Sequence, residues 1–282
     1  MLRPKKKLML IALILSVTLI FTGCGKKEES PQATGDSTGL SGSITIAGST
    51  SVQPLSEELA KVFMDKNTGI TINVQGGGSS AGVKAVNEGA AQIGASSRDL
   101  KESEKSLGLT EHKIALDGIA VVVNPKNPVT ELTMEQVKKI FSGEISNWKE
   151  VGGKDSAINV ITREEGSGTR SAFEEIVLGE AKMYRKAITQ PSTGSVKTTV
   201  AGDENGIGYI SIGSLGEDVK GVKIDGVEPT IENVKNNSFK ISRPFLYLTK
   251  GEMNQATKAF IDFVMSEEGQ KIVTESHFIP VK

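Results

Sequence analysis

Residues 43–63 read SITIAGSTSVQPLSEELAKVF, and this stretch holds the unit from which the fold can be inferred. The apolar residues that alternate at its start predict a short strand, and the amphipathic stretch from Pro54 onward predicts a helix. Between them lies Gly48-Ser49-Thr50-Ser51, a turn of small and mostly hydroxylic residues. Strands and helices that alternate along the chain indicate an α/β fold, with helices covering the faces of a mostly parallel sheet.

The rest of the chain continues this alternation. The patterns predict further strands at residues 70–76, 91–97, 113–125, 157–164, 206–212, 219–225 and 239–250. They predict helices at residues 54–67, 80–90, 133–143, 168–179, 194–202 and 254–273.

Two of the predicted strands, 113–125 and 239–250, exceed the usual strand length of about 5 to 6 residues. A long strand can pass from one sheet to another. We therefore interpret these two strands, or the chain near them, as crossings between two lobes. Asp117, beside Gly118 in the first of them, is interpreted as a hinge or turn residue, with a role in ligand binding as the alternative.

The first residues have the pattern of an export signal. The basic residues Arg3, Lys5, Lys6 and Lys7 precede an apolar run at 8–21, and small residues follow it. The run is shorter than the ~20 apolar residues that a membrane-spanning helix needs. We therefore predict that residues 1–23 are a signal peptide that is removed.

Cys24, the only cysteine, stands where bacterial lipoprotein signals place the residue that receives a diacylglyceryl thioether. Phe21, three residues earlier, departs from the leucine that is usual there. The alternative is an N-terminal anchor helix with an incidental cysteine. We predict a lipidated N-terminus and flexible tether at 24–41, which would hold the protein on the extracytoplasmic face of the cell membrane.

Composition excludes several classes of protein. Among 282 residues, Lys and Arg number 33, Asp and Glu 34, His 2 and Cys 1. This balance gives no electrostatic reason to expect nucleic acid, and one cysteine excludes a disulfide framework and a thiolate zinc site. Loss of residues 1–23 would change the net charge from −1 to −5, because it removes four basic and no acidic residues. We expect no metal and no cofactor.

Four loops share one chemistry, since each follows a β-like run and is rich in Gly, Ser or Thr. They are Gly48-Ser49-Thr50-Ser51, 76–80 (GGGSS), 94–98 (GASSR, with Ser97 and Arg98) and 163–170 (REEGSGTR). Unpaired N–H groups and partial positive charge at the start of a helix attract anions, and arginine matches a tetrahedral oxyanion. We predict that the four loops converge on one small anion held between two lobes.

Each loop also has other interpretations. Ser and Thr are the preferred N-caps of any helix, so a single loop is explained by capping alone. Residues 78–82 (GSSAG) match the G-x-S-x-G nucleophile elbow of a serine hydrolase, for which His112 and His277 are the only candidate bases. Gly76, Gly78 and Ala81 fit a loose dinucleotide pattern, which is weak in so glycine-rich a stretch.

At these residues the sequence resembles the solute-binding subunits of bacterial phosphate ABC transporters. The motifs that carry the resemblance spread over nearly the whole mature chain: AGSTSVQPL (47–55), QGGGSSAGVKAV (75–86), IGASSRDL (93–100), DGIAVVVNP (117–125), FSGEISNW (141–148), REEGSGTR (163–170) and GYIS (208–211). The resemblance implies an α/β, two-lobed type II periplasmic-binding-protein fold, with the ligand cleft between lobes joined by two crossings.

The resemblance also implies a set of phosphate-binding residues and no catalytic residue. It assigns the Thr50 hydroxyl and the Ser51 N–H, then Ser79, then Arg163 as the charge partner with Ser167, Gly168 and Thr169 as further donors. The neighbouring Ser49, Ser97 and Arg98 complete the predicted site. Some family members have an aspartate where Ser97 stands, which accepts the proton that phosphate retains and sulfate lacks.

The resemblance and the two crossings together predict the domain organisation and the partners. We place a first lobe at 42–117 and 226–282 and a second lobe at 118–225. The expected function is to bind inorganic phosphate and deliver it to an ABC-type importer, with permease and ATPase subunits as partners, no nucleic acid, and a monomeric state. A sensing lipoprotein that binds an oxyanion without transport is an alternative.

Overall fold

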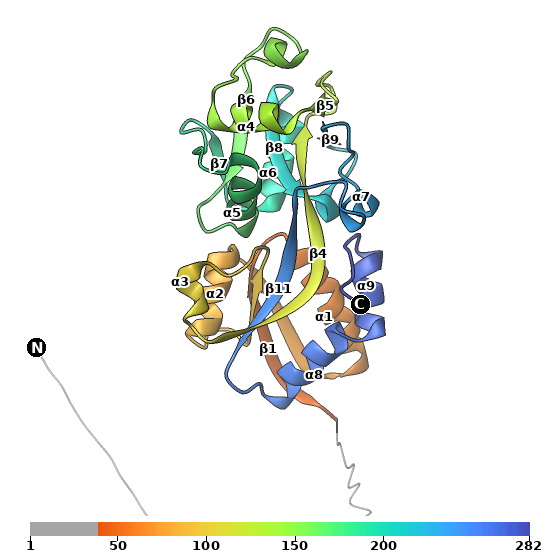
Figure 1. Cartoon of the computed structure of the whole chain (residues 1–282). Coiled ribbons are helices and arrows are strands. Elements are labelled where there is room, and N and C mark those ends of the chain that lie inside the picture. The colour runs from red at the N-terminus through yellow and green to blue at the C-terminus, as the bar shows by residue number, and fades with distance from the viewer. Residues whose placement is uncertain (1–38) are drawn as a thin grey trace, which may run out of the picture. The chain divides into compact units, whose positions relative to one another are not determined.

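The computed structural model describes residues 39–282, and these form one compact unit. The predicted signal peptide, Cys24 and most of the predicted tether lie outside the described residues. Figure 1 shows two groups of helices and strands in this unit, linked by two long strands, β4 (Leu109–Val123) and β11 (Ser242–Lys250). The expectation of two lobes joined by crossings is therefore confirmed for the described chain.

The first lobe comes from both ends of the described chain. Its strands are β1 (Ser41–Gly48), β2 (Gly69–Gly76) and β3 (Ile93–Ser96). Its helices are α1 (Gln53–Lys66), α2 (Ser79–Asn87), α3 (Glu102–Lys105), α8 (Gln255–Val264) and α9 (Glu267–Glu275).

The second lobe comes from the middle of the chain. Its strands are β5 (Glu131–Leu132), β6 (Asn159–Arg163), β7 (Ile188–Gln190), β8 (Gly206–Ser211), β9 (Lys220–Gly221) and β10 (Lys223–Ile224). Its helices are α4 (Met134–Ser142), α5 (Gly168–Phe173), α6 (Thr193–Gly202) and α7 (Ile231–Lys235). A π-helical turn, Glu174–Leu178, continues α5, and 3₁₀ turns lie at Trp148–Val151 and Ile212–Ser214.

Most strands belong to one sheet in the order β2-β1-β3-β11-β4-β8-β6-β7, with β9 also paired to β4, and β5 and β10 form a separate two-stranded sheet. Pairing is parallel within each lobe, where β1 lies between β2 and β3, and β6 lies between β8 and β7. The crossing strands run antiparallel to each other and to β3 and β8. The expected mostly parallel sheet is therefore corrected to a mixed one, because strand–helix alternation reports only the local units and not the strands that connect lobes.

Each lobe has its own hydrophobic core, and β4 contributes to both. Ile114 and Ala115 pack in the first core, whereas residues 119–123 are fully buried in the second. Between them, a Cβ added at Gly118 would lie 2.1 Å from Cδ1 of Ile212. The strand can therefore pass so close to the second lobe only because this position carries no side chain.

The return crossing lies later in the chain than the predicted boundary at residue 226. Val234, Phe239 and Ile241 pack in the core of the second lobe, and Phe245 packs in the core of the first. We therefore propose that the second lobe extends to about Ile241, since apolar contacts of this kind are what define a domain core.

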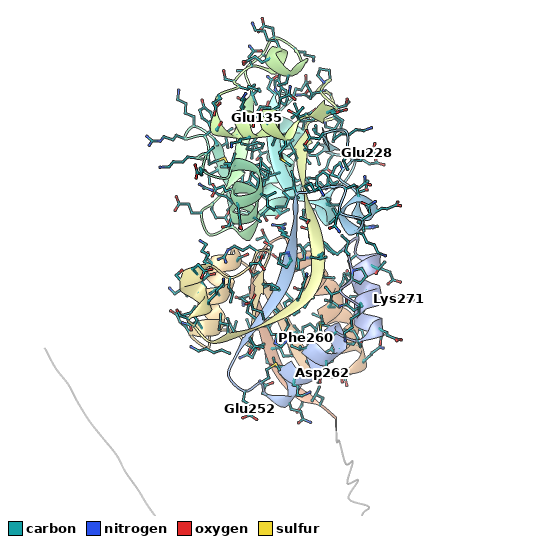
Figure 2. The ribbon with its side chains drawn as sticks, in the orientation of Figure 1. Glu135, Glu228, Glu252, Phe260, Asp262 and Lys271 are labelled. Atoms are coloured by element: carbon teal, nitrogen blue, oxygen red, sulfur yellow. The ribbon has the colours of Figure 1, made fainter. Side chains whose placement is uncertain are left out.

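The predicted helix at 254–273 is in fact two helices. The first ends at Val264, and Ser266 caps α9, because its Oγ accepts a hydrogen bond from the N–H of Gly269 at 3.2 Å. The apolar faces of the two helices pack inward, as the buried Phe260 shows, whereas Asp262 and Lys271 lie on the exposed side (Figure 2). This break lets the end of the chain cover the first lobe.

Candidate phosphate site between the lobes

Three serines from three loops of the first lobe meet at one point. The Oγ of Ser49 donates to the Oγ of Ser97 at 2.8 Å, and the Oγ of Ser79 lies 3.4 Å from the Oγ of Ser97. The N–H of Ser97 also donates to the Oγ of Ser79 at 3.0 Å. Each serine is 3% exposed or less. Because β1 lies beside β3, the turns at the ends of these strands are brought together.

Hydroxyls from the second lobe complete the cluster. The Oγ of Ser51 lies 2.8 Å from the Oγ1 of Thr169 and 2.8 Å from the Oγ1 of Thr193. The N–H of Thr193 donates to the Oγ1 of Thr50 at 3.2 Å. These contacts join residues more than a hundred positions apart in the sequence, and they link the two lobes directly. The geometric prediction that the first, second, third and fourth loops share one place is confirmed.

Gly168 lies where the two lobes approach each other closely. A Cβ added to it would lie 2.2 Å from the Oγ of Ser79 and 2.7 Å from the Oγ of Ser97. No real side chain tolerates such distances, so the contact requires glycine. Beside it, the N–H of Ser80 donates to the carbonyl oxygen of Gly166 at 3.1 Å. The Gly-rich fourth loop therefore lets the second lobe reach the serines of the first.

Arg163 supplies the buried positive charge on the second lobe. Its Nε and Nη2 donate to the carboxylate of Glu164 at 2.9 and 2.8 Å, and its Nη1 donates to the Oγ1 of Thr193 at 3.2 Å. The arginine side chain is 2% exposed and that of Glu164 30%. The Nη1 edge of the guanidinium thus faces the hydroxyl cluster, as a charge partner for an anion would.

Tyr209 supports the strand that carries Arg163. Its hydroxyl lies 2.7 Å from the Oγ1 of Thr162 and accepts a hydrogen bond from the N–H of Arg163 at 3.3 Å. Burial raises the pKa of Tyr209 to about 12, so the phenol stays neutral. Its ring also stacks on Phe173 with a centroid distance of 4.1 Å. This packing fixes the start of the fourth loop.

Two predicted residues have other partners. Arg98 donates through Nη1 and Nη2 to the two carboxylate oxygens of Glu104 at 2.7 and 2.8 Å, and through Nη2 to the Oγ of Ser80. Ser167 caps α5, since its Oγ accepts from the N–H of Arg170 at 3.2 Å. Both Nη atoms of Arg98 are thus occupied, whereas its Nε is buried without a hydrogen-bond partner among the described residues. Ser167 is buried beside the cluster and its hydroxyl proton remains free to donate.

Comparisons with known proteins give the family. A model described as a PBP superfamily domain matches residues 30–268. Over 98% of this chain and 95% of the relative, the sequence is 39% identical to the phosphate-binding protein PstS of Bacillus subtilis. The chain belongs to the phosphate-binding protein family of ABC transporters.

Solved structures of this family share the fold. A phosphate ABC transporter substrate-binding protein from Clostridium perfringens, solved with bound phosphate, is 49% identical, with a TM-score of 0.84 over 86% of this chain and all of that one. An ABC-type phosphate transport receptor from Vibrio cholerae is 39% identical, with a TM-score of 0.71 over 85% of this chain and all of that one. The predicted type II periplasmic-binding fold is confirmed.

The serine-hydrolase alternative finds no support in this family member. The Oγ of Ser80, the serine of the elbow pattern, accepts a hydrogen bond from Arg98 at 3.2 Å. His112, one of the two candidate bases, lies in β4, and its Nε2 is 3.0 Å from the Oγ1 of Thr249. The geometry of a nucleophile bonded to a base is therefore not formed by Ser80 and His112.

The sequence analysis missed two residues of this region. Thr193 follows Pro191-Ser192 and begins α6, so it had the same hydroxylic signal before a helix as the four predicted loops. Arg243, on β11, is 3% exposed and donates through Nη1 to the carbonyl oxygen of Ser97 at 3.3 Å. No local pattern marks Arg243, because its partners come from distant segments.

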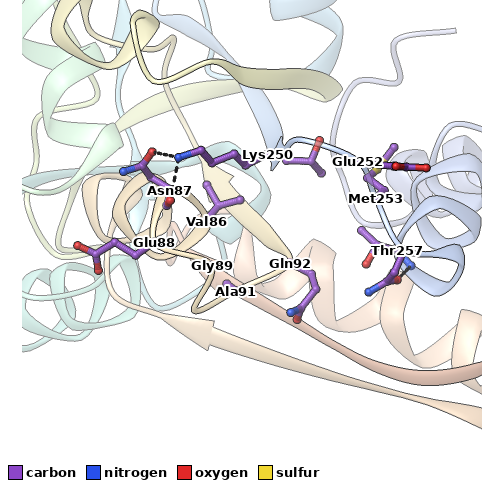
Figure 3. A pocket seen from close by; sticks show the side chains of 12 residues that line it. Val86, Asn87, Glu88, Gly89, Ala91, Gln92, Lys250, Glu252, Met253 and Thr257 are labelled. Carbon is purple, nitrogen blue, oxygen red and sulfur yellow. Dashed lines mark hydrogen bonds between the residues drawn. The ribbon is translucent and has the colours of Figure 1, made fainter.

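A concavity lies on the first lobe, away from the hydroxyl cluster and near the C-terminal end of α2 (Figure 3). It encloses about 430 Å³ and contains none of the predicted site residues. Lys250 closes one side, where its Nζ donates to the carbonyl oxygen and the Oδ1 of Asn87 at 3.0 and 2.7 Å (Figure 3).

Within residues 39–282, no helix has both the length and the apolar character to span a membrane.

Proposed function

We propose that this chain binds inorganic phosphate between its two lobes and delivers it to an ABC-type importer, without a catalytic step. The observation that carries the proposal is the contact of Ser51 with Thr169 and Thr193, each 2.8 Å away, which brings hydroxyl donors of both lobes to one buried point. The family relationship supports it, since the related Clostridium perfringens protein was solved with bound phosphate.

The proposed site replaces the hydration shell of the anion with protein donors. Hydroxyls of Ser49, Thr50, Ser79, Ser97 and Thr169 surround the shared point, and backbone N–H groups at Ser51 and Gly168 complete the set. Arg163 is proposed as the charge partner through its Nη1 edge. Many donors in a dry cleft can hold a divalent anion with few cations, because hydrogen bonds to charged groups are the strong ones.

The hydroxyl of Ser97 can replace the aspartate that some family members have at this position as a hydrogen-bond acceptor. A serine can both donate and accept hydrogen bonds, so Ser97 is proposed to accept a hydrogen bond from the protonated oxygen of phosphate while its own hydroxyl donates elsewhere. In the structure its Oγ accepts a hydrogen bond from the Oγ of Ser49 at 2.8 Å, so this hydroxyl already acts as an acceptor here, which supports the proposal. We expect sulfate, which lacks that proton, to bind more weakly than phosphate.

The proposed partners follow from transport. Closure of the two lobes around phosphate would present a defined shape to a permease driven by an ATPase. We also propose that Cys24 carries the lipid that holds a monomer on the extracytoplasmic face of the membrane. A mass measurement of the protein from its native membrane, against a Cys24→Ser variant, tests the lipid separately from phosphate binding.

Titration calorimetry with residues 39–282 tests the binding proposal. We expect phosphate to bind at micromolar concentration or below and sulfate to bind at least about tenfold more weakly, equal to about 1.4 kcal/mol. The matched control is a Ser51→Ala and Thr169→Val double variant, which removes hydroxyls of both lobes with little change in volume. Absence of heat with phosphate in the folded wild-type protein would contradict the proposal.

A further inference from the structure

An ion pair lies where the two crossing strands meet. Asp117 of β4 and Arg243 of β11 are opposite each other in the antiparallel register. The Nε and Nη2 of Arg243 donate to the Oδ2 of Asp117 at 3.2 and 2.9 Å, and both side chains are 1% exposed. Fully buried ion pairs cost desolvation energy and are weak contributors to stability, so this one calls for another explanation.

The pair is connected to both lobes. On the second lobe, the Oγ of Ser211 donates to the Oδ1 of Asp117 at 2.8 Å, and the backbone of Gly213 also bonds to this carboxylate. On the first lobe, the Nη1 of Arg243 donates to the carbonyl oxygen of Ser97 at 3.3 Å. The carboxylate therefore faces the second lobe, and the guanidinium faces the third loop of the proposed phosphate site.

Burial acts on both charges of the Asp117–Arg243 ion pair. Burial raises the pKa of Asp117 and lowers the pKa of Arg243, while each opposes the shift of the other. Burial outweighs the hydrogen bonds from Arg243, Ser211 and Gly213, which favour the anion, so the pKa of Asp117 lies above its ordinary value. The guanidinium donates to the carbonyl oxygen of Ser97, whereas the carboxylate accepts from Ser211.

Other buried arginines of this region are neutralised by carboxylates as well. Arg163 has Glu164, and Arg98 has Glu104. None of these three arginines is therefore unpaired beside a buried dianion. The electrostatic attraction that the dianion feels depends on which end of each ion pair faces it. Arg243 resembles Arg163 in that the carboxylate takes Nε and Nη2 and leaves Nη1 for another partner. It differs because this Nη1 holds the peptide carbonyl of Ser97.

We infer that Arg243 is a positioning residue of the phosphate site, which orients the Ser97 peptide and directs a second positive charge toward the anion, and that Asp117 limits this charge. The inference rests on the proposed function. It does not require Arg243 to touch phosphate. It assigns opposite effects to the two members of one ion pair, since Arg243 favours binding and the negative charge of Asp117 opposes it.

The test compares phosphate affinities, measured by calorimetry, of three variants with the wild type. We expect Arg243→Gln to weaken binding by about tenfold or more, which is about 1.4 kcal/mol, and Arg243→Lys to restore part of the loss because it keeps the charge. We expect Asp117→Asn, which keeps the shape and removes the negative charge, to bind phosphate as tightly as the wild type or more tightly.

The matched control is Lys220→Gln. Lys220 lies on β9, beside β4, and its Nζ donates to the carbonyl oxygen of Asn127. Like Arg243→Gln, the Lys220→Gln variant removes a cation that is bonded to a backbone carbonyl, but this cation lies outside the proposed site. We expect its phosphate affinity to equal that of the wild type. Thermal unfolding of each variant ensures that affinities refer to folded protein.

A purely structural ion pair predicts a different result. Both Arg243→Gln and Asp117→Asn would then lower the melting temperature and weaken phosphate binding together, and that outcome overturns the inference. If Arg243→Gln does not fold, the sign of the Asp117→Asn effect decides, because weaker binding by that variant contradicts the inference. Failure of the wild-type protein to bind phosphate would instead reject the proposed function.

Discussion

The third and fourth loops each carry a buried arginine, and the structure uses the two arginines differently. Arg98 gives both of its Nη atoms to Glu104, and its Nη2 also donates to the Oγ of Ser80. Arg163 gives Nε and Nη2 to Glu164, which leaves Nη1 for Thr193 in the centre of the hydroxyl cluster. The edge of the guanidinium that its carboxylate occupies decides what each arginine can bind.

This difference divides the proposed work between the lobes. The first lobe contributes serine and threonine hydroxyls and the starts of α1 and α2, whose first-turn N–H groups favour an anion. The second lobe contributes Arg163, the cation whose free edge reaches the cluster. We therefore expect the loss of a charge to lower phosphate affinity most on the second lobe, and an added side-chain atom to lower it most at the contact between the lobes.

The largest expected effect comes from Arg163→Gln. A hydrogen bond to a charged group contributes about 1.5 to 3 kcal/mol, so phosphate affinity should fall by a factor between about 10 and about 100. Arg98→Gln removes an equally buried arginine, and we expect it to change affinity by less than about threefold while it lowers stability. Calorimetry on both variants makes the comparison, and equal losses of affinity would refute the division between the loops.

A smaller effect on affinity is expected from Gly168→Ala. Its new methyl group would overlap the Oγ of Ser79, and overpacking of this kind costs about 1 to 3 kcal/mol. Because Gly168 and Ser79 belong to different lobes, the cost arises when the lobes meet, and calorimetry should show that phosphate affinity falls by about tenfold.

Gly166→Ala is the matched control for this steric prediction. Gly166 lies in the same loop as Gly168, and a Cβ added to it would lie 3.8 Å from the Cβ of Ser80 on the other lobe, an ordinary van der Waals contact. Affinity should therefore stay close to that of the wild type. Similar losses in the two variants would indicate that the loop needs glycine for its backbone conformation and not for the approach of Ser79.

The sequence predicted the loops better than it predicted the roles of their side chains. The small residues of Gly48-Ser49-Thr50-Ser51 and of the fourth loop mark turns that only a close contact or a cap requires, so their position could be inferred. The hydrogen-bond partners of the loop side chains could not be inferred in this way. Glu104 follows Arg98 by six residues, and nothing in that spacing indicates that the carboxylate takes both Nη atoms.

Residues brought together by strand pairing were the hardest to foresee. Asp117 was interpreted as a hinge or turn residue, yet it is buried in β4 and paired with Arg243, 126 positions away. The antiparallel pairing of two crossing strands has no local signal, because each strand shows only its own apolar pattern. Thr193 is a different case, because Ser192 and Thr193 stand at the start of a helix and so carry the hydroxylic signal of the four predicted loops, and its hydroxyl lies between Ser51 and Arg163.

The smallest expected effect concerns the pH dependence of stability and tests the structural role of Arg98. Burial raises the pKa of Glu104, but the hydrogen bond and charge of Arg98 outweigh it, so the pKa lies below its ordinary value of 4.5. A carboxyl with a lowered pKa in the folded state stabilises the protein above its unfolded-state pKa and loses this contribution as the pH falls through the folded-state value.

Glu104→Gln should therefore lower the free energy of unfolding at neutral pH by about 1 to 3 kcal/mol, as for other hydrogen bonds between charged groups. The difference from wild type should shrink as the pH falls below 4.5, the ordinary value, because the wild-type carboxyl is then protonated as well. Urea unfolding across this pH range measures it, with Glu102→Gln on the same helix as the control, since the Glu102 side chain is 89% exposed. A difference that stays constant with pH would mean that Arg98 is not held by an ionised Glu104, and the contrast with Arg163 would lose its basis.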